Sequence, residues 1–238
     1  MFGFLDSGLG GLVALREFRK HSGGEVIYLG DLKHQPYGAR PRGEIVSLSE
    51  KAVSFLLDMG AEEVFIVCNT ISANALGSLR SKFGVPIHGI TEWVKYYTPP
   101  SDRRVVVIGT RATVESGYYQ RTLKAEGIPA PELALLIEEG HWDDGVVREY
   151  LNALLPEGEY VLVLGCTHYP VLIPVIRELR PKVEIVDPAS VLFRNLRREG
   201  GDFFVHVYLT RENPRYEDFL LRLGYERDVF SLHFVQDY

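Results

Sequence analysis

The sequence predicts an α/β protein made of two similar halves. Short apolar runs alternate with stretches of helical periodicity, which is typical of βα units and parallel sheets. This alternation occurs twice in the same order, on either side of a proline-containing segment at 96–104. The 238 residues are 46% hydrophobic and 24% charged, which is enough apolar material for a globular core. We therefore expect two pseudo-symmetric α/β domains with mainly parallel sheets and an active site in the cleft between them.

The first half is expected to contain three strand–helix pairs and a closing strand. Its apolar runs lie next to turn residues, and its helical stretches repeat apolar residues with a period near 3.6. The predicted strands are 2–5, 26–29, 64–67 and 87–90, and the predicted helices begin near Leu12 and cover 43–59 and 72–83.

The second half repeats this order, and a tail follows it. The predicted strands are 105–108, 133–137, 161–164 and 184–186, with helices at 113–125, 144–155, 171–179 and 190–198. The tail alternates at 203–209, shows a helical stretch at 217–223 and ends with a strand at 229–235. We expect the tail to pack back onto the first half. The predicted domains are therefore 1–98 with 203–238, and 99–202.

Charge and composition exclude several classes of protein. The chain has 32 acidic against 26 basic residues, a net charge of -6, which argues against a nucleic-acid binder. Its first residues lack a basic region, and Asp6 interrupts the apolar run, so no signal peptide is expected. No apolar stretch reaches the roughly 18 residues of a membrane span. We expect a cytoplasmic protein that contacts neither nucleic acid nor membrane.

The two cysteines give the strongest indication of function. A structural disulfide is not expected in a reducing cytosol, and no histidines flank Cys68 and Cys166 at zinc-site spacing. Each cysteine follows the third strand of its half, where parallel sheets bind ligands. If the halves face each other, the thiols meet across the cleft, and a pair of acid–base groups can exchange a proton on opposite faces of a carbon.

The predicted reaction sets requirements that the neighbouring residues meet. Each cysteine precedes a predicted helix, whose positive end favours a thiolate and lowers a thiol pKa from about 8.5 to roughly 3.5–7.5. Without an electron sink, hydrogen bonds must stabilise a carbanion-like state. Suitable side-chain donors at the strand ends are Ser7, Asn69, Thr70, Thr110, Thr113 and Thr167.

At these residues the sequence resembles the glutamate racemase family, within the aspartate/glutamate racemase superfamily. The matching segments are FLDSGLGGL, VIYLGD followed by PYG, VCNTISANAL, IGTRATVESGYY and LGCTHYPVL. They occur in the family's order over nearly the whole chain. The family uses neither pyridoxal phosphate nor a metal, so the resemblance implies no cofactor. It also implies a homodimer that supplies D-glutamate for peptidoglycan, and hence for cell-wall biogenesis and cell shape.

The resemblance also implies roles for individual residues. Cys68 would deprotonate the D-enantiomer and Cys166 the L-enantiomer, with Asp6, Glu138 and His168 as supporting polar groups. The choice of Glu138 over Glu139 rests on its position closer to the strand end and stays open. The implied substrate contacts are Asp6, Ser7, Pro36, Tyr37, Gly38, Cys68, Asn69, Thr70, Thr110, Thr113, Cys166, Thr167 and His168.

Alternative functions remain at this point. The chain has Thr91-Glu92-Trp93 where the family has an acidic residue followed by Pro-Gly. Aspartate racemase, or another member of the superfamily, is therefore an alternative. A two-lobed small-molecule binding protein would not need paired thiols. A redox switch would instead join Cys68 and Cys166 in a reversible disulfide.

Overall fold

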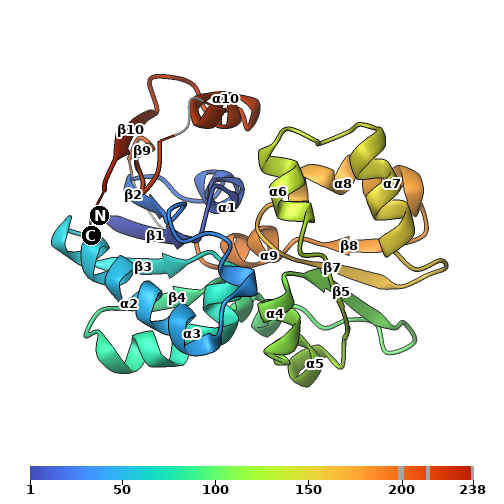
Figure 1. Cartoon of the computed structure of the whole chain (residues 1–238). Coiled ribbons are helices and arrows are strands. Elements are labelled where there is room, and N and C mark those ends of the chain that lie inside the picture. The colour runs from blue at the N-terminus through green and yellow to red at the C-terminus, as the bar shows by residue number, and fades with distance from the viewer. Residues whose placement is uncertain (198–200, 213–214, 237–238) are drawn as a thin grey trace.

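The computed structural model describes residues 1–197, 201–212 and 215–236 and contains two separate sheets (Figure 1). The first sheet has the order β10-β9-β2-β1-β3-β4. Its strands are β1 (Phe2–Asp6), β2 (Glu25–Gly30), β3 (Glu63–Ile66), β4 (Ile87–Gly89), β9 (Phe204–Leu209) and β10 (Phe230–Phe234). Every pair in this sheet is parallel within the described residues. All four strand tips of the first half therefore point to one edge.

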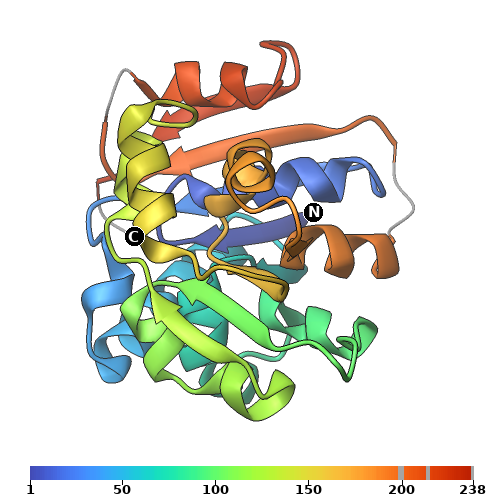
Figure 2. The same cartoon turned by 90° about the vertical axis from the view of Figure 1, so that its right-hand side faces the viewer.

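The second sheet, in front in Figure 2, repeats the topology of the first half. It contains β5 (Val105–Gly109), β6 (Glu126–Pro129), β7 (Val161–Gly165) and β8 (Glu184–Val186) in the order β6-β5-β7-β8, again all parallel. In both halves the strands lie in the order second, first, third, fourth. The predicted pseudo-symmetric fold class is thereby confirmed, and β3 and β7 are equivalent strands.

Helices cover the sheets because each has an apolar face. In α2 (Arg42–Asp58), for example, the buried residues include Ile45, Leu48, Ala52 and Leu56, which lie on one side of the helix and pack in the core beside the first sheet. The other helices of the first half are α1 (Gly10–Arg19), η1 (Tyr37–Ala39), α3 (Asn69–Lys82) and η2 (Ile90–Tyr96). Those of the second half are α4 (Arg111–Glu115), α5 (Tyr118–Leu123), α6 (Leu133–Glu138), α7 (Gly145–Leu154), η3 (Tyr169–Leu172), α8 (Ile173–Leu179) and α9 (Pro188–Asn195).

One predicted strand was wrong. The apolar run 133–137 forms the helix α6, and the second strand of this half is β6 instead. A five-residue apolar run has no periodicity that separates a strand from a buried helical turn. Leu133 and Ile137, four residues apart, are buried, whereas Leu135 between them is exposed, as on a helix. Because β6 is the second strand of this half along the chain, β7 is still the third.

Smaller differences concern helix continuity. The predicted helix 113–125 is divided into α4 and α5. Gly117, which lies between them, has a left-handed backbone with a φ of 66°, and this conformation interrupts the helix. The predicted helix 171–179 begins as the 3-10 turn η3. The predicted helix 190–198 corresponds to α9, which ends earlier, at Asn195; Arg198 itself lies outside the described residues.

The tail returns to the first sheet, as predicted. β9 pairs with β2, β10 pairs with β9, and the helix α10 (Arg215–Arg222) connects them (Figure 1). The division into 1–98 with 203–238, and 99–202, stays a prediction. Phe193 on α9 packs against Phe4 and Phe18 in the first half, so the end of the second segment also contributes to the first core. No helix in the described part of the chain is long and apolar enough to cross a membrane.

Candidate active site

A cavity of about 450 Å³ lies between the carboxyl ends of the two sheets. Strand ends β1, β3, β5 and β7 each contribute polar side chains, as expected for parallel sheets. The predicted site residues that line the cavity are Asp6, Ser7, Pro36, Tyr37, Gly38, Cys68, Asn69, Thr70, Thr110, Cys166, Thr167 and His168. Both cysteines are free thiols that face this one cavity, with 5% and 6% of their surface exposed.

Cys68 lies directly before α3, and its sulfur is 3.3 Å from the Ser7 Oγ. Burial, followed by the negative charge of Asp6, raises the pKa of this thiol from 9.0 to about 12. The hydrogen bond with Ser7 and a backbone contact at Ile71 oppose this shift without cancelling it. The expectation that the helix start holds Cys68 as a thiolate is therefore wrong for the free protein, because loss of hydration outweighs the helix end.

Asp6 joins the two sheets across the cavity. Its Oδ1 accepts the Gly8 backbone N–H at 2.8 Å, and its Oδ2 accepts the Thr167 hydroxyl at 3.0 Å. Burial raises the pKa of this carboxyl, although the charge of His168 and both hydrogen bonds lower it in part. Asp6 therefore fixes Thr167, the residue that follows Cys166, against the first strand.

Cys166 has a different support. His168 Nδ1 lies 3.5 Å from the Cys166 sulfur, and His168 Nε2 lies 2.7 Å from Glu138 Oε1. Burial disfavours a charged imidazole, yet the contacts with Cys166 and Glu138 raise the His168 pKa well above 6.5. An imidazolium donates from both ring nitrogens, so the Cys166 sulfur is placed as an acceptor. In contrast to Cys68, this thiol precedes only the short turn η3.

Glu138, rather than Glu139, makes these contacts. It lies at the end of α6, and its Oε1 also accepts the Leu9 backbone N–H at 3.2 Å and the Gln35 Nε2 at 3.0 Å. Burial favours its neutral form, but the hydrogen bond and charge of His168, together with the hydrogen bonds from Gln35 and Leu9, lower the Glu138 pKa. Glu138 does not line the cavity itself, so it acts on the cavity through His168.

Three threonines form a hydrogen-bonded cluster where α3 and α4 meet. The hydroxyl oxygen of Thr70 lies 2.8 Å from that of Thr110 and 3.2 Å from that of Thr113. Thr113 is fully buried and, unlike the other two, does not line the cavity, so its predicted substrate contact has no direct geometry here. Thr110 also caps α4 by accepting the Thr113 backbone N–H. The cluster thus ties α3 of the first half to α4 of the second.

Asn69 brings an amide donor to the cavity. Its Oδ1 accepts the Tyr119 hydroxyl at 2.6 Å, and Tyr119 in turn accepts the Trp93 indole N–H at 3.1 Å. Its Nδ2 is buried and has no hydrogen-bond partner among the described residues. The carbonyl end is therefore fixed, and the amide donors remain for a ligand.

Glycines keep two site elements close together. A Cβ on Gly10 would lie less than 3.0 Å from His168 Nδ1 and Thr167 Oγ1, so α1 can approach these side chains only without one. A Cβ on Gly38 would meet Thr110 at a similar distance. These two positions require glycine for close packing rather than for an unusual φ.

Eight further residues of the cavity wall escaped the sequence analysis: Gln35, Ala39, Arg111, Pro131, Glu132, Ala134, Leu135 and Arg211. Gln35 reaches Glu138 from the loop after β2, Arg111 follows Thr110, Pro131 precedes α6, and Arg211 follows β9 in the tail. Gln35 and Arg111 lie close in sequence to predicted site residues, which could have indicated them. In the described part of the chain, no three His, Cys, Asp or Glu side chains gather as metal ligands would.

Known proteins with the same architecture support the resemblance seen in the motifs. The family model for Asp/Glu/Hydantoin racemase matches residues 38–196. The glutamate racemase of Carboxydothermus hydrogenoformans is 36% identical over 95% of this chain and 93% of its own length. That of Persephonella marina is 32% identical over 90% of both chains.

Solved structures agree with these relatives over the full fold. A glutamate racemase of Thermus thermophilus in complex with β-chloro-D-alanine has 31% identity and a TM-score of 0.83, covering 98% of this chain and 96% of that one. A glutamate racemase isoform of Bacillus anthracis has 27% identity and a TM-score of 0.88, covering 99% and 97%. These matches identify the chain as an enzyme, an isomerase of the racemase class. The chain belongs to the glutamate racemases of the Asp/Glu/Hydantoin racemase family.

Proposed function

We propose that this enzyme interconverts L- and D-glutamate without a cofactor, with Cys68 and Cys166 as the two acid–base groups. One observation carries the proposal: two buried thiols follow topologically equivalent strands, β3 and β7, and line the same cavity. A substrate Cα between them presents one face to each sulfur. One thiolate then removes the α-proton while the opposite thiol delivers another.

The surroundings of the two thiols favour one starting state. In this state Cys166 is the base, because His168 Nδ1 is placed to donate a hydrogen bond to its sulfur, and Cys68 is the acid, because burial and Asp6 raise its pKa. This state is ready to deprotonate the L-enantiomer at Cys166 and to protonate the other face from Cys68. For the D-enantiomer, Cys68 must first lose its proton, and a substrate ammonium group near Asp6 favours that loss by offsetting the carboxylate charge.

The remaining barrier comes from the weak acidity of an amino-acid Cα–H. When the proton leaves, negative charge spreads onto the α-carboxylate, and donors aimed at that carboxylate stabilise the transition state. The unpartnered Asn69 amide and the hydroxyls of Thr70 and Thr110 are suitable donors at the cavity wall. Ser7, Thr167 and the 36–38 loop complete the proposed binding site, and Thr113 supports it through the threonine cluster.

The proposed biological role follows from the relatives, which are glutamate racemases by name. We propose that the enzyme acts in the cytoplasm as a homodimer and supplies D-glutamate for peptidoglycan. Aspartate, shorter by one methylene, is the alternative substrate. Its turnover relative to glutamate measures which amino acid the cavity prefers.

The decisive experiment separates racemisation from one-base chemistry. In deuterium oxide, the wild-type enzyme should exchange the α-proton of L-glutamate for deuterium while optical rotation is lost, with no cofactor added. Cys68→Ser and Cys166→Ser should each abolish racemisation, since a serine hydroxyl is too weakly acidic to replace a thiol. Normal racemisation by either variant would refute the two-thiol mechanism.

β-Chloroalanine distinguishes the two faces. After one base removes the Cα proton, the electron pair forms a Cα=Cβ bond and chloride leaves. The resulting enamine hydrolyses to pyruvate and ammonia. Cys68→Ser should retain this elimination for the L-form, and Cys166→Ser for the D-form. Each variant serves as the matched control for the other, because each keeps one thiol and the same binding residues. The reverse pattern would exchange the two faces.

A further inference from the structure

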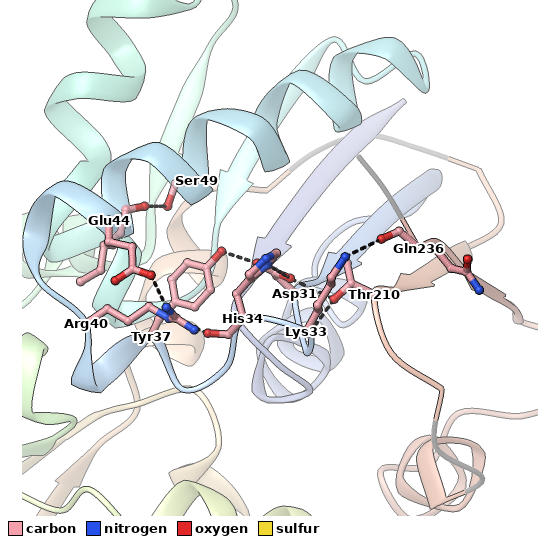
Figure 3. A network of polar contacts seen from close by, with 10 residues as sticks. Asp31, Lys33, His34, Tyr37, Arg40, Glu44, Ser49, Thr210 and Gln236 are labelled. Carbon is pink, nitrogen blue, oxygen red and sulfur yellow. Dashed lines mark hydrogen bonds and ion pairs between the residues drawn. The ribbon is translucent and has the colours of Figure 1, made fainter.

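Two buried polar networks adjoin the cavity, and they differ in what they leave for a ligand. In the first, the fully buried Asp31 accepts the Tyr37 hydroxyl at 2.5 Å on Oδ2 and the Thr210 hydroxyl at 2.9 Å on Oδ1 (Figure 3). Both hydroxyl protons end on this carboxylate, so the network fixes the cavity wall at Tyr37 and the tail at Thr210. The second network ends at Asn69 and leaves one buried donor without a partner among the described residues.

The second network is a chain of two hydrogen bonds between three buried side chains. The Trp93 indole N–H donates to the Tyr119 hydroxyl oxygen at 3.1 Å, and the Tyr119 O–H donates to Asn69 Oδ1 at 2.6 Å. None of the three residues is more than 2% exposed. Trp93 lies on η2 and Asn69 begins α3, both in the first half, whereas Tyr119 comes from α5 of the second half. The chain therefore passes from the first half to the second and back.

The indole gives this chain its direction. An indole N–H can only donate, so the Tyr119 oxygen accepts at that end, and its own proton is left for Asn69. Burial raises the Tyr119 pKa from its ordinary value of 10.0, although the Trp93 hydrogen bond opposes this in part, so the hydroxyl keeps the proton that it donates. The two ends of an asparagine amide have nearly the same shape, but only the carbonyl oxygen can accept that proton. The Asn69 NH2 group is therefore turned away from Tyr119, on a residue that lines the cavity.

A second set of contacts holds the same elements together. Tyr118, the residue before Tyr119, donates its hydroxyl to the Thr91 backbone carbonyl at 3.1 Å, and the Thr91 Oγ1 lies 2.7 Å from the Ser72 Oγ on α3. The segment 91–93 therefore contacts both α5 and α3. It is also the segment in which the chain departs from the family pattern of an acidic residue followed by Pro-Gly. Neither proline nor glycine has a side-chain donor that could replace the indole.

We propose that Trp93 and Tyr119 are positioning residues that turn the Asn69 amide so that its NH2 group meets the substrate. The inference rests on the proposed racemisation, in which the Asn69 amide stabilises the negative charge that develops when the α-proton leaves. A donor that is aimed at developing charge in advance lowers the barrier, because it does not have to reorient during the reaction. Trp93 and Tyr119 do not line the cavity themselves, so they act on kcat through Asn69.

The test measures whether Tyr119 acts through Asn69. Tyr119→Phe removes the hydroxyl and keeps the ring, and it should lower kcat about tenfold in both directions while KM changes less, since the amide is no longer held toward the developing charge. Trp93→Phe tests the same chain from its other end and should lower kcat by a smaller factor. Asn69→Ala should lower kcat about a hundredfold. In that background Tyr119→Phe should have no further effect, because the residue through which it acts is gone.

Tyr225→Phe is the matched control. Tyr225 is also buried, its hydroxyl donates to the Leu12 backbone carbonyl at 2.8 Å, and neither residue lines the cavity, so this variant should keep the wild-type kcat. Thermal unfolding verifies that each variant is folded at the assay temperature. A wild-type kcat in Tyr119→Phe or Asn69→Ala, an equal loss in Tyr225→Phe, or the same effect of Tyr119→Phe with and without Asn69 would overturn the proposal. A wild-type enzyme that does not racemise glutamate would instead refute the proposed function.

Discussion

The two thiols should react with an alkylating reagent at very different rates, although they are equally buried. Only the thiolate attacks iodoacetamide. With its pKa at about 12 rather than 9.0, Cys68 carries about one ten-thousandth thiolate at pH 8, against about one tenth for an ordinary thiol. Alkylation of Cys68 should therefore be about a thousandfold slower than alkylation of an equally accessible thiol with the ordinary pKa of 9.0. Cys166, beside the His168 imidazolium, should react first.

Mass spectrometry of the two cysteine peptides after timed alkylation measures both rates in one sample. Because 5% of Cys68 and 6% of Cys166 is exposed, access does not explain a large difference between them. Asp6→Asn removes one of the charges that raise the Cys68 pKa and should speed alkylation of that residue. Equal rates at the two cysteines in the wild-type enzyme, or faster reaction of Cys68, would show that the buried carboxylate and imidazole do not set the thiol states as argued.

Three other predictions concern the supports of the site. Glu138→Gln should destabilise the fold by about 3 kcal/mol relative to the exposed-residue control Glu139→Gln, since it leaves a buried charge unpaired. The raised His168 pKa gives stability that is complete below pH 6.5, and the lowered Glu138 pKa gives stability that is complete above pH 4.5. The loss, measured by thermal unfolding, should therefore be largest between these values; a pH-independent loss would contradict the ion pair. Gly10→Ala should reduce kcat about a hundredfold by displacing His168, whereas Gly43→Ala, with open space around it, should not. Racemisation should survive exhaustive chelation, and rescue of a chelated enzyme by one metal would refute the proposed mechanism.

Much of the architecture was accessible from the sequence because buried parallel strands are short apolar runs. The runs at 105–108 and 161–164 are fully buried in β5 and β7, and their polar successors lie around the cavity. The run at 133–137 failed because five apolar residues fit either a strand or a helical turn. Glu138 was expected after a strand but lies at the end of the helix α6. Its contact with His168 depends on tertiary packing and not on which type of element precedes it.

The thiol states and the tail could not be predicted from local sequence. The Cys68 pKa depends on burial and on Asp6, 62 residues earlier in the chain, which outweigh the helix start that the sequence shows. Arg211 reaches the cavity only because β9 pairs with β2, a contact across more than 170 residues. The apolar alternation of 203–209 indicates a strand but does not say which edge it joins.

The two halves share their strand order but support their thiols with different chemistry, and racemisation limits what this asymmetry can achieve. L- and D-glutamate have equal free energies in water, so the equilibrium constant is one and kcat/KM must be the same in both directions. A more basic Cys68 cannot make the enzyme faster toward one enantiomer at low substrate concentration. It can only raise kcat and KM together for one direction. The proposed starting state, with Cys166 charged and Cys68 protonated, is the form that binds the L-enantiomer. KM should therefore be lower for L-glutamate than for D-glutamate, with kcat lower in the same proportion. Initial-rate circular dichroism in both directions measures this ratio. A lower KM for the D-enantiomer would mean that Cys68 carries the charge.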